Sequence, residues 1–158
     1  MFAFFYFTSC SILLLVAEAL LRSIGLTVPL LGFFFLAAAF TVSSRMAFGF
    51  ALVFGVALDF VLGYAAPWDG ILLPLLTLPS FFLHGKHLSS DVLEFLAGAL
   101  IPPVMAIPHL WISLTTPEAF AALMMSCLFG AFLFPLMLAL ISRSAARLQI
   151  GAPGEGGV

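Results

Sequence analysis

The feature that most constrains the fold is a succession of long apolar runs, separated only by short breaks of charged, polar or Gly/Pro residues. Hydrophobic residues make up 64% of the 158 positions, and charged residues make up only 8%. An ordinary soluble domain has about 25% charged residues and needs them to cover its surface. The composition therefore excludes a soluble enzyme, a nucleic-acid-binding module and a disordered chain, and it predicts an integral membrane protein.

The breaks divide the chain into about six segments, each close to the roughly 20 apolar residues that cross a bilayer. The predicted spans cover residues 2–21, 26–42, 46–63, 68–83, 92–114 and 117–141. We expect an all-α integral membrane protein with about six transmembrane helices in one polytopic bundle. In this interpretation residues 1–142 form the six-span transmembrane domain. Residues 143–158, which end in GAPGEGGV, form a flexible cytoplasmic C-terminal tail.

The basic residues sort to one side of the predicted bundle. With six spans, both termini share a side with four of the five basic residues: Arg45, Lys86, Arg143 and Arg147. Only Arg22 lies on the other side. Cytoplasmic loops carry the excess of Lys and Arg, so we expect both termini in the cytoplasm. The first apolar run has no preceding basic residue and no small-residue cleavage site, so we interpret it as a retained span.

Asp59 is the most informative polar residue, because it lies near the end of an otherwise apolar predicted span. It belongs to a stripe of mostly small residues at intervals of four: Ala47, Ala51, Gly55, Asp59 and Gly63. Such a stripe lets another helix approach closely, for packing or for partner binding. Three interpretations of Asp59 are open. It is a polar anchor at a helix–helix or protein–protein contact, or it binds a substrate, or it is an acid near a helix end that reaches the headgroup layer.

Glu18 and Arg22 are four residues apart near the end of the first span, a spacing that allows an ion pair. A solvated pair at the membrane interface is the simpler interpretation, and such exposed pairs contribute little to stability. Arg22 is also the only basic residue predicted on that side of the membrane. It is therefore the natural partner for Asp59.

No motif in the chain indicates catalysis, a metal or a cofactor. His84 and His87 have H-x-x-H spacing, but no Cys or third His lies near them, so we expect a solvated loop. No G-x-S-x-G motif supplies a nucleophile. We therefore expect a non-enzymatic protein with no catalytic residue, metal or cofactor, whose partners include membrane lipid but no nucleic acid.

Prolines punctuate the predicted spans in the second half of the chain. Within a helix each proline removes a backbone donor and introduces a kink, and broken helices line the sites of some transporters. Kinked helices also occur in ordinary packed bundles. The adjacent Pro102 and Pro103 are expected either to kink the fifth span or to split it in two.

The stretch GFALVFGVALDFVLGYAAPWDGILLPLL resembles the rod shape-determining protein MreD family. A glycine-rich span ends in an acid and is followed by a short Pro/Gly turn, with matching positions at Gly49, Gly55, Asp59, Gly63, Pro67 and Gly70. The resemblance implies a non-enzymatic scaffold in the bacterial inner membrane, part of the cell-elongation machinery that controls rod shape and lateral peptidoglycan synthesis. It implies MreC, RodA, a penicillin-binding transpeptidase and MreB as partners.

An alternative is the substrate-binding membrane component of an energy-coupling-factor-type vitamin transporter, a class to which the MreD family looks similar. In that case Arg22, Asp59, Trp68 and Asp69 would line a vitamin pocket on the outer side. The small-residue stripe serves either interpretation, because a transporter component also needs a face for its coupling subunit. An orphan structural membrane protein is a third interpretation.

Overall fold

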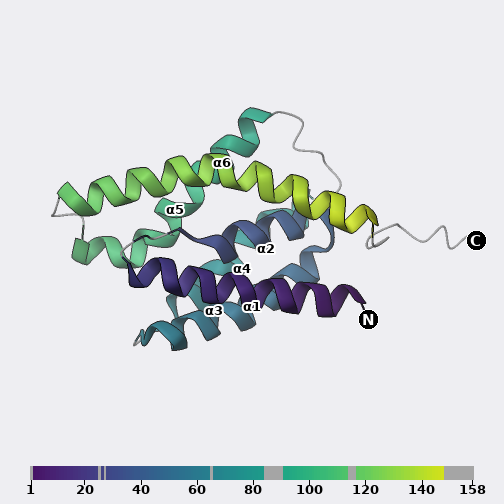
Figure 1. The fold of residues 1–158 in the computed structure, drawn as a ribbon, viewed down its shortest axis with the longest axis horizontal. Helices are drawn as coiled ribbons and strands as arrows, with labels where there is room; N and C mark the ends of the chain where they lie inside the picture. The colour runs from purple at the N-terminus through teal and green to yellow at the C-terminus, as the bar shows by residue number, and fades with distance from the viewer. Residues whose placement is uncertain are drawn as a thin grey trace, which may run out of the picture.

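The computed structural model describes residues 2–24, 26, 28–64, 66–83, 91–113 and 117–147. The regular structure of these residues is helical, in six helices: α1 (Phe2–Ser23), α2 (Leu30–Thr41), α3 (Ser44–Leu62), α4 (Trp68–Leu83), α5 (Asp91–Ser113) and α6 (Pro117–Arg147). Successive helices run in alternate directions, and α1 begins at the same end of the bundle at which α6 finishes (Figure 1). We call this end proximal, and the opposite end, where α1 and α3 finish, distal.

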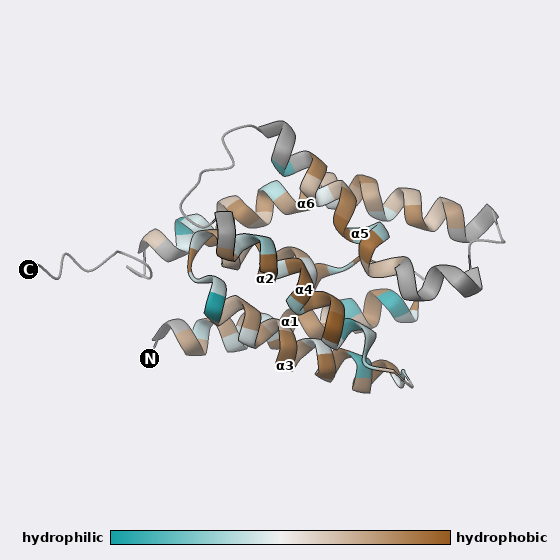
Figure 2. Ribbon diagram, turned by 180° about the vertical axis from the view of Figure 1, so that it is seen from behind, coloured by the Kyte–Doolittle hydropathy of each residue, from teal (hydrophilic) through white to brown (hydrophobic). Residues whose placement is uncertain are grey.

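Three described helical segments are long and apolar enough to cross a membrane: Phe4–Ser23, Ser44–Leu62 and Phe120–Ser144. The helices α2 and α4 are shorter, with 12 and 16 residues. Hydrophobic residues dominate the middle of the bundle, and hydrophilic residues lie mainly toward the helix ends (Figure 2). The predicted class is thus confirmed as an all-helical bundle with membrane-spanning candidates, and six crossings remain a prediction.

The predicted boundaries fit best at α4, which has the predicted bounds. They fit least well at the start of α2 and at the end of α6. The second span was predicted from residue 26, but α2 begins at Leu30, directly after Pro29 at its N-cap. The predicted tail was wrong over residues 143–147, which continue α6 to Arg147 because nothing in SRSAAR breaks a helix. Residues 148–158 lie outside the described residues, as do His84 and His87.

The fifth helix continues through Pro102 and Pro103 without interruption. Its direction changes between its first and last turns (Figure 1), as expected for prolines that remove backbone donors inside a helix. It packs closely against α6. A Cβ atom added to Gly98 would meet the carbonyl oxygen of Gly130, and one added to Gly130 would meet the carbonyl oxygen of Gly98. The two backbones therefore touch at this glycine pair.

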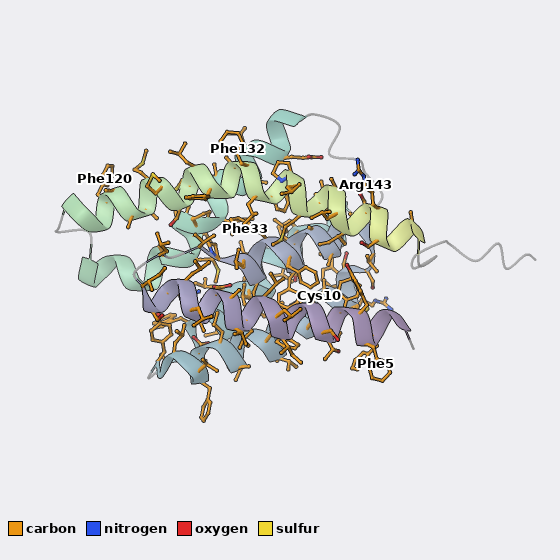
Figure 3. All side chains as sticks on the ribbon, viewed as in Figure 1. Phe5, Cys10, Phe33, Phe120, Phe132 and Arg143 are labelled. Atoms are coloured by element: carbon orange, nitrogen blue, oxygen red, sulfur yellow. The ribbon has the colours of Figure 1, made fainter. Side chains whose placement is uncertain are left out.

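The helix α2 is the centre of the bundle and packs against all five other helices. Its residues from Leu31 to Ala39 are all buried, which explains why phenylalanine can occupy three successive positions on different faces. Phe33 lies between α2 and α6 (Figure 3), with its ring centroid 6.3 Å from that of Phe134. The closely packed pairs α3–α4 and α5–α6 flank α2, and α1 packs against α2 and α3.

Large apolar side chains also cover the outside of the bundle. Phe5 on α1 and Phe120 on α6 point away from the other helices (Figure 3), and Phe132 on α6 is also largely exposed. Water would oppose so many exposed apolar groups, whereas lipid tails match them. The outer surface therefore agrees with a bundle that is solvated by a bilayer.

Candidate functional site

Four charged side chains lie near one another at the distal end of the bundle: Glu18 and Arg22 of α1, Asp59 of α3 and Asp69 of α4. Glu18 and Asp69 are fully buried, Asp59 is nearly so, and the side chain of Arg22 is only 10% exposed. We call these four residues the distal charge cluster. Their burial is the first sign that they bind one another rather than solvent, because buried charges are stable only when paired.

Arg22 is the centre of the ion pairs in the distal charge cluster. Its Nη2 donates to Glu18 Oε1 at 2.6 Å, and its Nη1 donates to Asp69 Oδ2 at 2.8 Å. A longer bond of 3.3 Å joins Nη2 to Asp69 Oδ1, so the guanidinium engages both oxygens of that carboxylate. The predicted Glu18–Arg22 pair is therefore present, but the interpretation that it is solvated was wrong. The natural partner proposed for Arg22, Asp59, was also wrong, since Arg22 pairs with Asp69.

Asp59 binds backbone amides instead of a cation. Its Oδ1 accepts from the Asp69 N–H at 3.0 Å and its Oδ2 from the Gly70 N–H at 2.7 Å. These amides belong to the first turn of α4, where the N–H groups have no partner within the helix and the helix dipole favours an anion. Asp59 is therefore a polar anchor between two helices, which is one of the interpretations that the sequence left open.

The turn between α3 and α4 brings Asp59 to these amides. Gly63 ends α3 with a left-handed φ of 69°, a conformation that favours glycine. The Tyr64 N–H then donates to the Asp59 carbonyl oxygen at 3.0 Å, and the chain reverses before α4. At the start of α4, the Ile71 N–H donates to the Pro67 carbonyl oxygen at 3.1 Å. Proline suits this entry position because the first amides of a helix have no intrahelical acceptor.

Glu18 repeats the same contact on the neighbouring helix pair. Its Oε2 accepts from the Leu31 N–H at 2.8 Å, in the first turn of α2. The N-cap residue of α2 is Pro29, which makes no side-chain cap. Glu18 therefore satisfies an amide of α2 and, through its other oxygen, the guanidinium of Arg22.

The small-residue stripe faces the inside of the protein. Ala47, Ala51, Gly55 and Asp59 are buried, whereas Gly63 is exposed and belongs to the turn. A Cβ atom on Gly55 would lie 2.5 Å from the Asp69 carbonyl oxygen and 2.8 Å from the Gly70 Cα, so α4 fills the close approach that the stripe permits. Of the two predicted roles of this face, packing is the one observed, and the second helix belongs to the same chain.

The chemistry available in the distal charge cluster is almost entirely used internally. Each of the six carboxylate oxygens of its three acids accepts a hydrogen bond from the guanidinium or a backbone amide. Arg22 Nε is a buried donor without a partner. Within the described part of the chain, no three His, Cys, Asp or Glu residues are grouped so as to hold a metal ion. The arrangement is suited to holding helices together.

Two contacts of the site were not predicted from the sequence. Asp69 was named beside Arg22 only as part of the vitamin pocket, and its pairing with Arg22 was missed because the two residues lie 47 positions apart. The role of Leu31 was missed because a backbone amide has no residue signature. A signal was nevertheless present. In both helix pairs, an acid one turn before a span ends is followed by a proline and then by a new apolar helix. That order places the acid beside the unpaired amides of the next helix.

Comparison with known proteins leaves the chain without a match. No protein-family model matches it, and no curated protein or solved structure does so either. A proposal for its function therefore has to be argued from the sequence, the fold and the contacts of the distal charge cluster.

Proposed function

We propose that this chain is a non-enzymatic scaffold of the bacterial cell-elongation machinery in the inner membrane, similar to the MreD family. One observation carries the proposal: the residues on which the resemblance depends together build the α3–α4 hairpin. Gly55 contacts the backbone at Gly70, Asp59 caps α4, and Gly63 turns the chain. The shared motif is therefore a structural unit with its polar groups satisfied, which is expected of a scaffold element rather than of a reactive site.

The same contacts favour the scaffold over the vitamin-transporter alternative. A ligand pocket needs a few polar groups that converge on the ligand and are unpaired without it. The residues proposed for that pocket, Arg22, Asp59 and Asp69, instead bind one another and the start of α4. A ligand would have to break these buried contacts before it gained its own.

In this proposal all six helices cross the membrane and both termini are cytoplasmic. Two exposed arginines support this side: Arg45 lies in the first turn of α3, which begins at the proximal end, and Arg143 lies near the proximal end of α6 (Figure 3). Cytoplasmic segments are rich in basic residues. The 12-residue helix α2 is too short to span alone, but the other five helices surround it, so it need not match the bilayer thickness. A reporter that works only in the periplasm tests this topology when it is fused at Val158. It should be inactive, and an active fusion would overturn the topology.

The internal position of the small-residue stripe restricts where partners bind. In the scaffold proposal, MreC, RodA, the penicillin-binding transpeptidase and MreB contact other faces, because α4 covers the stripe. A substitution in the stripe therefore acts on partners through the fold of the hairpin. Substitutions on the exposed side of α3 act on partners directly.

Affinity purification of the tagged chain from gently solubilised native membranes tests the proposal. Recovery of MreC, RodA or the transpeptidase is the expected result. Recovery of ATPases with a coupling subunit would establish the transporter, and recovery of neither group would refute the scaffold. Two glycine variants of α3 separate the two routes by which partners can be lost. Gly55→Leu should lose the partners together with the fold of the hairpin. Gly49→Leu should keep the fold, because a Cβ atom at Gly49 meets nothing within 4 Å, so any partner that it loses contacts the exposed side of α3 directly.

A further inference from the structure

The distal surface of helices α1 to α4 is apolar although turns and helix ends form it. Phe60 is 87% exposed, Ile24 is 70% exposed and Trp68 is 44% exposed. Leu26 and Tyr64, in the same two turns, are also exposed. We call these five residues the distal apolar surface. Among the described side chains of α1 to α4 at this end, the acids of the distal charge cluster are buried and the side chain of Arg22 is only 10% exposed.

Such a surface is unusual for turns that project into water. Turns are ordinarily rich in polar side chains, because they are solvated. Here the described parts of both turns expose aliphatic and aromatic groups, and no exposed charge accompanies them. Trp and Tyr, with an apolar ring and one polar atom, are the residues that settle where lipid headgroups meet acyl chains. Their presence indicates a lipid boundary at this depth.

The lengths of the helices agree with that position. The 16 residues of α4 extend about 24 Å, and the 19 residues of α3 extend about 28 Å. The hydrocarbon core of a bilayer is about 30 Å thick. If exposed Arg45, at the start of α3, marks the proximal headgroup layer, the distal turns do not extend beyond the opposite one. The apolar segment of α6, with 25 residues, is longer at about 37 Å.

We propose that phospholipid, at the boundary between headgroups and acyl chains, covers the distal apolar surface. The α1–α2 and α3–α4 turns lie within the membrane interface, and the bilayer is thinner beside α3–α4 than beside α6. Thinning is feasible because mismatch costs only fractions of a kcal/mol per Å. Lipid then shields the distal charge cluster from water on this side. The inference goes beyond the proposed function, since it applies to a scaffold and to a transporter alike.

Tryptophan fluorescence tests the proposal directly, because the chain has only two tryptophans. In the Trp111→Phe variant, the emission comes from Trp68 alone. The full chain is reconstituted in phosphatidylcholine vesicles and quenched with acyl-brominated phosphatidylcholine or with aqueous acrylamide. Lipid bromines near the headgroup should remove most of the emission, and acrylamide should remove little. Strong quenching by acrylamide would place Trp68 in water and overturn the proposal.

A thiol-accessibility measurement gives an independent test on another helix. In a Cys10→Ala, Cys127→Ala background, Ile24→Cys and Arg45→Cys place one thiol at the distal and one at the proximal end. The vesicles are permeabilised so that the reagent reaches both faces of the membrane. The thiol of Ile24→Cys should then react about tenfold more slowly with a charged maleimide than the thiol of Arg45→Cys, because thiolate formation needs water. Equal rates for the two thiols would contradict the proposal that lipid covers the distal apolar surface.

The fluorescence experiment has a further outcome that would overturn the proposal. Protection of Trp68 from both quenchers would show that protein, and not lipid, covers the surface.

Discussion

The α1–α2 and α3–α4 hairpins use the same device at the distal end. In each, an acid near the end of the first helix accepts hydrogen bonds from amides at the start of the second. Glu18 binds the Leu31 N–H, and Asp59 binds the N–H groups of Asp69 and Gly70. Each pair thereby satisfies donors that would otherwise be unpaired in a lipid environment, where such a donor costs several kcal/mol.

The two hairpins differ in what the acid does with its second oxygen. Asp59 gives both oxygens to α4, and the backbones of α3 and α4 touch at Gly55. Glu18 accepts a hydrogen bond from α2 with one oxygen and from Arg22 with the other. Arg22 also forms an ion pair with Asp69 of α4. Lipid tails are as apolar as the helices, so apolar contact alone drives little association. The α3–α4 pair is therefore held by close backbone contact, and α1 is joined to α4 by charge.

The largest expected effect comes from filling the glycine contact of α3–α4. Gly55→Leu should prevent normal folding, because its Cβ atom would lie 2.5 Å from a backbone oxygen of α4. Overpacking of side chains that can shift typically costs about 1–3 kcal/mol, but this contact is with the backbone of α4, so we expect loss of the folded hairpin and not a graded loss of stability. Size-exclusion profiles and thermal unfolding in detergent measure the loss. Gly49→Leu is the matched control, and similar profiles for both variants would show that the close contact is dispensable.

Removing the charge that joins the hairpins should have the next largest effect. Arg22→Leu leaves Glu18 and Asp69 buried without their cation, which should cost about 3–5 kcal/mol. Arg22→Lys should lie between this variant and the wild type, because an ammonium cannot reproduce the forked contacts of a guanidinium. Thermal unfolding midpoints rank the three proteins. If leucine and lysine were equivalent, the ion pairs would not be what fastens α1.

Weakening the α4 cap alone should have a smaller and more local effect. Asp59→Asn keeps one acceptor and presents an amide group to the second backbone donor, which should cost about 1–2 kcal/mol. Hydrogen–deuterium exchange should accelerate in the peptide that contains Asp69 and Gly70. The peptide that contains Leu31 is the internal comparison, since Glu18 caps it. Equal acceleration in both peptides would mean that the caps are not separate.

The smallest expected effect has the opposite sign. Ser11 is fully buried on α1, and its hydroxyl has no hydrogen-bond partner. Ser11→Ala should therefore stabilise the protein, by up to about 1 kcal/mol. Ser80 of α4 is equally buried, but its hydroxyl donates to the Thr77 carbonyl oxygen at 2.6 Å, so Ser80→Ala should lower the unfolding temperature. Shifts in the same direction would contradict the assignment of Ser11 as unpaired.

The helices could be located from the sequence because hydropathy and helix breakers act locally. A run of apolar residues closed by Gly63 or Pro67 predicts a helix end whatever the rest of the chain does. The tail from residue 143 was misjudged for the same reason: its serines and arginines are polar but do not terminate a helix, so α6 reaches Arg147. Polarity alone therefore marks where an apolar span ends, and not where its helix does.

The distal charge cluster could be predicted only in part. The i,i+4 spacing of Glu18 and Arg22 revealed their pair, because the geometry of one helix decides it. The spacing did not reveal whether the pair is buried, since that depends on which helices surround it. The stripe that contains Gly55 predicted a close helix contact, because its side chains are small. Small side chains do not show which helix packs against them.

The sequence by itself determined an apolar, all-helical chain, the positions of its helices and the face of α3 that another helix can approach. These properties follow from the chemistry of neighbouring residues. Only the tertiary structure decided that α4 occupies that face, that Arg22 pairs with Asp69 rather than Asp59, and that Glu18 caps α2. Hydrogen bonds form over about 3 Å, so residues distant in the chain can be matched only once the helices lie side by side.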